Sequence, residues 1–292
     1  MAELQVEKRV DSRAVALETT LLVHGVPHNA SLRLAEELDA IVRAEDSTPA
    51  LIGVVEGRPT VGMNRAELQS MIEGGDVPKV NTANLGHAFH AGYSAATTVS
   101  STMEIAAHAG LRVFATGGIG GVHRGYGERL DISADLVAFT RYPVAVVTSG
   151  VKSILDVVAT REALESLGIT VIGFGTDTFP AFYMRDGGCG VDIRIDDLDD
   201  LAGFVRSELP RTGRGIVIAN PIPVDDEISK PDWEGWLQRA EQRAIDEGVS
   251  GRDVSPAVLG GLHEVSEGRT LEANLALVKS NARVAAAVES LL

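Results

Sequence analysis

The stretch that decides the fold is ATGGIGGVHRGYGERLDISADL, residues 115–136, followed closely by SGVKSILD, residues 149–156. The first stretch contains six glycines, a His-Arg pair, two aspartates and a serine. It lies between RVFAT at 112–116 and VAVVTS at 144–149, two apolar runs that predict short buried strands. A glycine-dense loop after a strand can bring backbone N–H groups close to an anion. The sequence therefore predicts an anion-binding loop at the end of a strand.

A lysine, Lys152, follows the second predicted strand among small or apolar neighbours. Burial disfavours the charged ammonium, and a neutral amine can form a Schiff base with a carbonyl. The alternative is a surface lysine at a helix start, although the helix dipole disfavours a cation there. Together, loop and lysine indicate a phosphate-bearing substrate beside an activated amine. A nucleotide cofactor is not expected, because neither G-x-G-x-x-G leading directly into a helix nor G-x-x-x-x-G-K-[ST] occurs.

The composition is that of a globular protein, with 292 residues of which 45% are hydrophobic and 23% charged. The chain has no linker-like or low-complexity run, which favours a single domain over residues 1–292. A net charge of -15 argues against a nucleic-acid partner, because no basic stripe is present to neutralise phosphates. The lone Cys189, the charged N-terminus and the lack of a membrane-length apolar run predict a cytoplasmic protein without a membrane partner.

Strand-like runs alternate with helical patterns along most of the chain. Residues 15–25 read as a strand leading into a loop, residues 49–63 as a hairpin, and residues 153–168 as a helix that ends at a glycine. The C-terminal third is predicted to be helical. This alternation predicts a three-layer α/β/α sandwich, and the hairpin makes a mixed, largely parallel central sheet the expected form.

Acidic side chains stand out in two of these segments. Glu18 is the only charge in its apolar run, and a buried carboxyl with a raised pKa suits a general acid, whereas an edge strand could turn it to solvent. Asp131, Ser133 and Asp135 alternate, so in an extended segment they would share one face and suit Mg²⁺ or Mn²⁺. The alternative for these three is an Asx or N-cap turn. His123 could contact a phosphate or simply cap a loop.

Eight motifs in this order resemble the pseudouridine-5'-phosphate glycosidase family, also called indigoidine synthase A-like. They are ALETT, PKVN, ATTVSSTM, FATGGIGGVHRG, DISADL, SGVKSILD, FPAFY and VIANPIP. The resemblance covers nearly the whole chain. It implies an α/β/α sandwich that assembles as a homotrimer.

The resemblance also implies chemistry at a C–C glycosidic bond between ribose 5-phosphate and uracil. By motif, Lys152 is expected to form an imine with the sugar's anomeric carbon, Glu18 to donate a proton, and Asp131 to hold Mn²⁺ through its carboxylate and waters. The expected substrate contacts are Lys79, Thr98, Val99, Thr116, His123, Ser133, Ala134, Asp135 and Asn274.

The chain departs from the family pattern where the aglycone is expected to bind. Residues 81–85 are Asn-Thr-Ala-Asn-Leu in place of the usual Ser-Arg-Arg-Asp-Leu, which removes two rigid charged donors. This change favours a C-glycosynthase that joins ribose 5-phosphate to an aromatic polyketide, resembling the alnumycin type. The alternatives are a pseudouridine-5'-phosphate glycosidase and a non-catalytic paralogue that binds sugar phosphate.

Overall fold

The central sheet is mixed and largely parallel, as predicted. The computed structural model describes residues 4–11, 13–127, 130–246 and 254–292, in which eleven strands form one sheet in the order β1-β4-β3-β2-β7-β9-β13-β11-β12. Strand β6 pairs with both β3 and β5 beside this row. Only the pairs of β3 with β4 and of β3 with β6 are antiparallel within the described sheet. The predicted hairpin is therefore the antiparallel β3–β4 pair.

The strands and helices have the following bounds. The strands are β1 Glu7–Lys8, β2 Ala14–Glu18, β3 Thr48–Val55, β4 Arg58–Val61, β5 Lys79–Val80, β6 Ala95–Thr97, β7 Val113–Ala115, β8 Val122–His123, β9 Ala145–Thr148, β10 Leu155–Asp156, β11 Val171–Phe174, β12 Ile193–Ile195 and β13 Ile216–Ala219. The helices are α1 Thr19–His24, α2 His28–Ala44, α3 Arg65–Glu73, α4 Leu85–Ala91, α5 Val99–His108, α6 Ala134–Arg141, α7 Val157–Ser166, α8 Leu198–Thr212, α9 Lys230–Asp246, α10 Val254–Val265 and α11 Arg269–Leu291. Strands β8 and β10 form a separate two-stranded ribbon.

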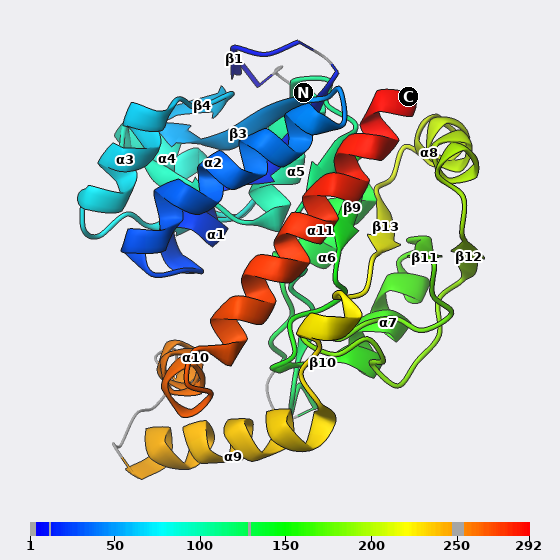
Figure 1. The fold of residues 1–292 in the computed structure, drawn as a ribbon. Coiled ribbons are helices and arrows are strands. Elements are labelled where there is room, and N and C mark those ends of the chain that lie inside the picture. The colour runs from blue at the N-terminus through cyan, green and yellow to red at the C-terminus, as the bar shows by residue number, and fades with distance from the viewer. Residues whose placement is uncertain (1–3, 12, 128–129, 247–253) are drawn as a thin grey trace.

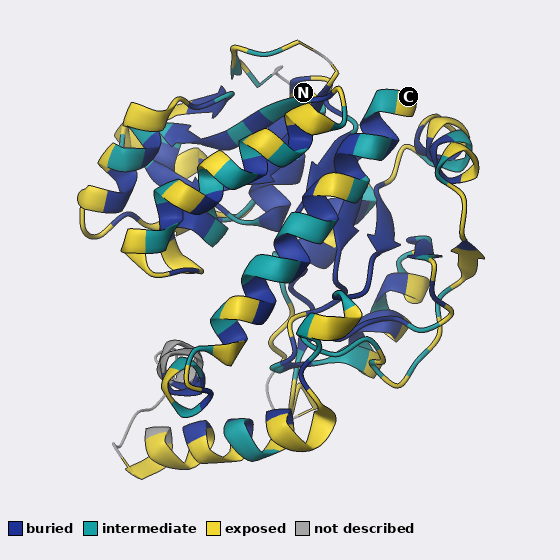
Figure 2. Ribbon diagram, viewed as in Figure 1, coloured by how far each residue is buried: buried dark blue, intermediate teal, exposed yellow. Residues whose placement is uncertain are grey.

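Helices cover both faces of the sheet and give two apolar cores. Successive strand residues point to opposite faces, so in β2 Val15 and Leu17 join one core while Ala14 and Ala16 join the other. The first core contains the buried sides of α2, α3, α8 and α11, and the second contains those of α5, α6 and α7 (Figure 1). Buried residues fill the interior while exposed ones lie on the outer sides of the helices (Figure 2). The three-layer α/β/α sandwich is confirmed.

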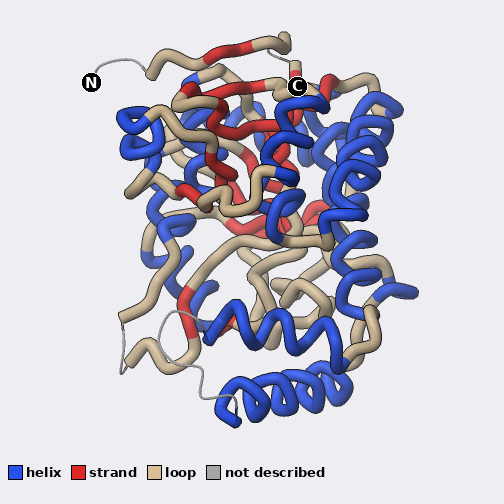
Figure 3. Tube along the Cα trace, turned by 90° about the vertical axis from the view of Figure 1, so that its left-hand side faces the viewer, coloured by secondary structure: helices blue, strands red, loops and turns tan. Residues whose placement is uncertain are grey.

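The C-terminal third is helical in its described part, as predicted. Helix α11 lies along β7, β9 and β2 (Figure 1), where Ala282, Ala285 and Ala286 let it approach the sheet closely. Helices α9 and α10 pack against each other at the base of the molecule (Figure 3). Residues 247–253 of the predicted helical region lie outside the described residues, as do residues 1–3 and 12 of the N-terminal segment. None of the described helices is both long and apolar enough to cross a bilayer.

Two predicted boundaries are wrong. The segment after Glu18 is not a loop but helix α1, which packs against α2 and β6, because its buried Leu22 and Val23 fill the first core despite the low helix propensity of the preceding threonines. The helix predicted from residue 153 begins only at Val157. Asp156 caps it, since its Oδ1 accepts from the backbone N–H of Ala159 at 2.9 Å.

Candidate active site

The candidate site lies between β2 and β7, where the order of the strands in the sheet reverses. From β2 the chain crosses to β3 on one side, whereas β7, the neighbour of β2 on the other side, leads on to β9. The connection through α2 packs into the first core and that through α6 into the second, so the two crossovers cover opposite faces. A crevice is expected at the carboxyl ends of β2 and β7 in such a sheet. Glu18 ends β2, and Thr116 directly follows β7.

Glu18 is a buried carboxyl in an interior strand, which excludes the edge-strand alternative. Strands β3 and β7 flank β2, and only 8% of Glu18 is exposed. Its Oε1 makes a short hydrogen bond with the Thr116 hydroxyl. Burial raises the pKa of Glu18, while the charge of Lys152 and the Thr116 hydrogen bond oppose this shift without cancelling it. Glu18 therefore holds its proton to a higher pH than an ordinary glutamate, as a general acid requires.

Two lysines place positive charge beside Glu18. Lys152 lies on the loop after β9 and Lys79 begins β5, and both act electrostatically on Glu18. Desolvation lowers the pKa of Lys79, and the charge of Lys152 lowers it further. The prediction of a buried Lys152 is wrong, because the residue is exposed although Val151 and Ser153 on either side are buried. The alternative of a surface lysine at a helix start is confirmed in its exposure but wrong in its position, because α7 begins only at Val157 and leaves Lys152 on a loop.

Asp135 does not share an extended face with Asp131 and Ser133, so that prediction is wrong and the N-cap alternative is confirmed. Ser133 caps α6 by accepting from the Asp135 N–H at 3.2 Å. Asp135 is buried in the first turn of α6, where its Oδ1 accepts from the Ser100 N–H at 2.9 Å and its Oδ2 from the Gly120 N–H at 2.8 Å. Asp135 thereby ties the glycine loop to the start of α5.

Replacing Asp135 with alanine is expected to lower the free energy of unfolding by about 2–4 kcal/mol, because two buried N–H groups lose their charged acceptor. Urea unfolding monitored by circular dichroism measures this. Asp199→Ala is the matched control, since Asp199 is an exposed aspartate in the first turn of α8 and should change stability by less than about 1 kcal/mol. Equal stabilities of the two variants would contradict the structural role of Asp135.

Asp131 offers an exposed carboxylate for a cation. It is exposed, and its Oδ2 lies 3.8 Å from Nδ1 of His123. Within the described ranges no three or more His, Cys, Asp or Glu side chains are grouped so that they could hold a metal. Hard cations such as Mg²⁺ keep several waters and use one or two carboxylates, and Asp131 fits only that mode. Asp135 does not fit, because both its oxygens already accept backbone hydrogen bonds.

The other predicted contacts surround the same glycine loop. Thr98 and Val99 begin α5, and Ala134 begins α6 beside Ser133. Asn274 of α11 is only 9% exposed, and its Oδ1 has no hydrogen-bond partner in the part of the chain that the structure describes. A Cβ atom added to Gly117 would lie 3.5 Å from this oxygen. A buried amide acceptor without a partner beside the loop is available to a donor on a ligand.

The buried amide of Asn281 lies beside the site but is not among the residues predicted from the sequence. This α11 residue is fully buried, donates to the Thr116 carbonyl at 2.8 Å and accepts from the Asn220 side chain at 2.9 Å. It thus links α11 to the strand ends that carry the site. The available signal is an asparagine in NARVAAAV, a stretch in which Arg283 is the only other polar residue.

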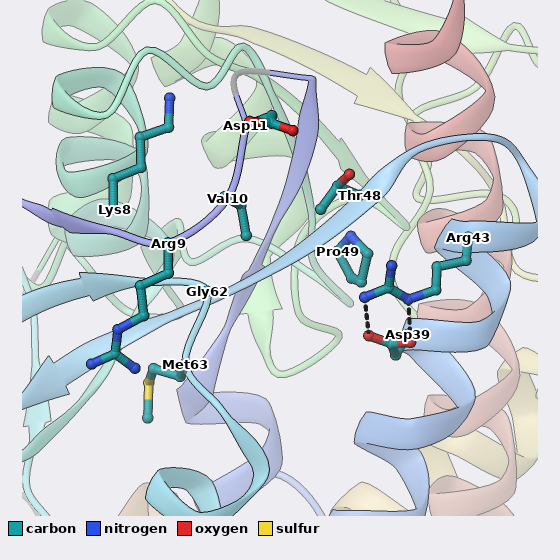
Figure 4. A pocket seen from close by; sticks show the side chains of 10 residues that line it. All are labelled: Lys8, Arg9, Val10, Asp11, Asp39, Arg43, Thr48, Pro49, Gly62 and Met63. Atoms are coloured by element: carbon teal, nitrogen blue, oxygen red, sulfur yellow. Dashed lines mark hydrogen bonds and ion pairs between the residues drawn. The ribbon is translucent and has the colours of Figure 1, made fainter.

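A basic hollow of about 610 Å³ lies at the opposite edge of the sheet, beside the start of β3 (Figure 4). Its cations already have partners. Arg43 pairs with Asp39 at 2.7 Å, Arg9 pairs with Glu67 at 2.7 Å, and Lys8 donates to a main-chain carbonyl at 2.8 Å. This hollow is therefore poorly suited to bind a phosphate.

Comparison with known proteins establishes the family. The model of the family described as Indigoidine synthase A like protein matches residues 5–290. The chain belongs to this family. Two relatives, both called pseudouridine-5'-phosphate glycosidase, are 44% identical to it. The protein of Methylobacterium nodulans aligns over 97% of this chain and 85% of its own length, and that of Deinococcus radiodurans over 94% and 88%.

Two solved structures of the indigoidine synthase A-like fold match 99% of this chain and 97% of their own. An indigoidine synthase A-like protein of Thermotoga maritima has a TM-score of 0.89 at 35% identity. The prealnumycin C-glycosynthase AlnA, in complex with ribulose 5-phosphate, has a TM-score of 0.90 at 32% identity. The predicted family and fold are confirmed, and the chain is an enzyme of this glycosidase and C-glycosynthase family.

Proposed function

We propose that this enzyme is a pseudouridine-5'-phosphate glycosidase, which converts pseudouridine 5'-phosphate and water to uracil and ribose 5-phosphate. The observation that carries the proposal is the buried Glu18, with its raised pKa, within electrostatic reach of Lys152 at the carboxyl edge of the sheet. Relatives with this name are 41–44% identical, against 32% for the C-glycosynthase. The glycosidase alternative thus has more support than the C-glycosynthase favoured by the sequence analysis.

The proposed mechanism opens the sugar before the C–C bond breaks. The Lys152 amine attacks the anomeric carbon, and the ring oxygen leaves and takes a proton from Glu18. The Glu18 carboxylate then takes a proton from the Lys152 nitrogen, and the freed lone pair expels the uracil carbon. Glu18 returns this proton to that carbon as the C–C bond breaks and leaves a protonated imine on Lys152. Water hydrolyses this imine to release ribose 5-phosphate. An amine is needed as the source of this electron pair, because a carbon leaving group cannot depart after simple protonation of a ring oxygen.

Other residues of the candidate site are proposed to bind the sugar phosphate. Lys79 supplies positive charge, and the positive ends of the α5 and α6 helix dipoles favour an anion. We propose that the Oδ1 of Asn274, which has no hydrogen-bond partner among the described residues, accepts from a sugar hydroxyl. His123, Ser133 and Thr98 lie around the same loop as further polar contacts.

Asp131, together with waters, would hold a divalent ion, proposed as Mn²⁺, which would supply fixed positive charge to the site when bound. Chelation should lower turnover by about 10-fold or more, and added Mn²⁺ should restore it.

Asp131→Asn should raise the Mn²⁺ concentration for half-maximal activity by about 10-fold, because a neutral amide binds a hard cation weakly. Titration of activity with Mn²⁺ measures this, with Asp199→Asn as control. Full activity after chelation would contradict the metal's role.

A C-glycosynthase acting on an aromatic aglycone is the second candidate. It is favoured by the asparagines at 81 and 84, which stand where the family usually has serine and aspartate around two arginines. Both candidates use the same lysine and sugar phosphate, so they differ in the aglycone and in whether the C–C bond is broken or made.

Incubation with pseudouridine 5'-phosphate, followed by chromatography for uracil, tests the proposed function. Release of uracil in equal amount to ribose 5-phosphate is the expected result. No release of uracil, together with capture of ribose 5-phosphate on the protein, would favour the aromatic aglycone. Neither release nor capture would indicate the non-catalytic paralogue. The homotrimer stays a prediction that light scattering can test.

A further inference from the structure

The loop that carries Lys152 is held from the side by a segment thirty residues further along the chain. Gly150 forms an antiparallel bridge with Ala181, and the Phe182 N–H donates to the Ser149 carbonyl at 2.8 Å. Residues 179–183 form the motif FPAFY, and none of them is among the site residues that the family resemblance implies. We call segments 149–153 and 181–183 the lysine clamp.

Ser153 closes this clamp next to the lysine. Its side chain is buried, with 3% of the residue exposed. The hydroxyl donates to the Ala181 carbonyl at 2.6 Å and accepts from the Tyr183 N–H at 3.3 Å. The Ser153 hydroxyl therefore satisfies both a backbone carbonyl and a backbone N–H of the opposite segment. These two hydrogen bonds fix the position of the 149–153 loop relative to residues 181–183.

Other contacts fix the main chain of Lys152 while its side chain stays exposed. The Lys152 N–H donates to the Ile119 carbonyl at 3.2 Å, and the Lys152 carbonyl accepts from Leu155 at 2.9 Å. Arg124 donates to the Ser153 carbonyl at 3.2 Å. The backbone is thus anchored to the glycine loop on one side and to the 181–183 segment on the other.

The clamp holds two backbone conformations that need support. Phe182 has φ of 61°, a left-handed conformation unfavourable for an aromatic residue. Its ring packs on the glycine loop, since a Cβ atom on Gly118 would lie 2.5 Å from it. Gly150 has φ of 81°, and any side chain there would collide with the Pro180 carbonyl. Unfavourable conformations of this kind persist when the surrounding contacts determine them, and they cluster at functional sites.

We infer that Ser153 is a positioning residue that holds Lys152 at attacking distance from the sugar. The inference rests on the proposed function. Ser153 acts through the backbone of its neighbour, so its loss should slow imine formation and leave sugar-phosphate binding nearly unchanged. A displacement of about 1 Å at a reacting group can cost roughly 100-fold in rate.

The test is Ser153→Ala, assayed by the rate of borohydride trapping at saturating ribose 5-phosphate and by turnover of pseudouridine 5'-phosphate. We expect the trapping rate and kcat to fall about 10- to 100-fold, while KM changes less than about 3-fold. Ser47→Ala is the matched control, because Ser47 is buried and donates to the Ala286 carbonyl at 2.8 Å at the opposite edge of the sheet. It should change either rate less than about 2-fold.

Ser153→Cys covers the case in which the alanine variant does not fold, because a thiol keeps the side chain but donates weakly. It should slow trapping at least about 5-fold. Trapping at the normal rate in a folded Ser153 variant, or a loss confined to KM, would overturn the inference and leave the proposed function standing. No trapping in the unaltered protein would overturn both.

Discussion

Lys152→Ala is expected to lower the turnover of pseudouridine 5'-phosphate by about 10³-fold or more, because the proposed mechanism forms its covalent bond to the sugar through the Lys152 amine. The lysine is exposed on its loop, so its removal should leave the free energy of unfolding nearly unchanged. Steady-state release of uracil, measured beside thermal unfolding, separates the two effects.

Two other lysine variants show whether the loss of turnover is specific to Lys152. Lys8→Ala removes a lysine at the opposite edge of the sheet and should keep full turnover. Lys79→Ala should raise KM, because it removes charge from the binding site, but should still form the covalent adduct. Full turnover by Lys152→Ala would end the imine mechanism, and loss of the adduct in Lys79→Ala alone would move the nucleophile to Lys79.

Glu18→Gln is expected to lower kcat by about 10²- to 10⁴-fold, the usual contribution of a general acid. Glutamine keeps the size of the side chain and can still accept from Thr116, but it has no proton to give. Glu289→Gln is the matched control. Glu289 is also fully buried with a pKa raised by burial, but it pairs with Arg112 at the opposite edge of the sheet, so its loss should leave kcat unchanged.

Glu18 should also make stability depend on pH. Its folded-state pKa lies above its unfolded-state value, so the folded protein binds this proton more tightly. The resulting contribution to the free energy of unfolding is complete below the unfolded-state pKa and is lost as the pH rises through the folded-state pKa. Urea unfolding from acidic to alkaline pH should therefore show a steeper decline for the unaltered protein than for Glu18→Gln. Parallel declines would mean that Glu18 is ionised in the folded state.

The sequence predicts the sheet and its layers, because apolar runs mark the strands. The use of Glu18, Lys79 and Lys152 in one site is predicted only by the family resemblance. The reaction at a C–C glycosidic bond is also predicted by the family resemblance and not by the spacing of residues.

The sequence does not predict how these residues are held. Helix α1 forms through packing of Leu22 and Val23 on α2, which local propensity does not reveal. The exposure of Lys152 depends on where α7 begins, and the cap at Asp156 was the signal for that boundary. The hydroxyl of Ser153 meets residues 181–183 only in the folded chain, so its partners could not be read from neighbouring sequence.

The most direct test of the imine mechanism is reduction with borohydride in the presence of ribose 5-phosphate, followed by mass mapping of the peptides. The mechanism predicts one stable sugar-phosphate adduct, on the peptide that contains Lys152. An adduct on the peptide that contains Lys79, or no adduct under conditions in which uracil is released, would contradict it.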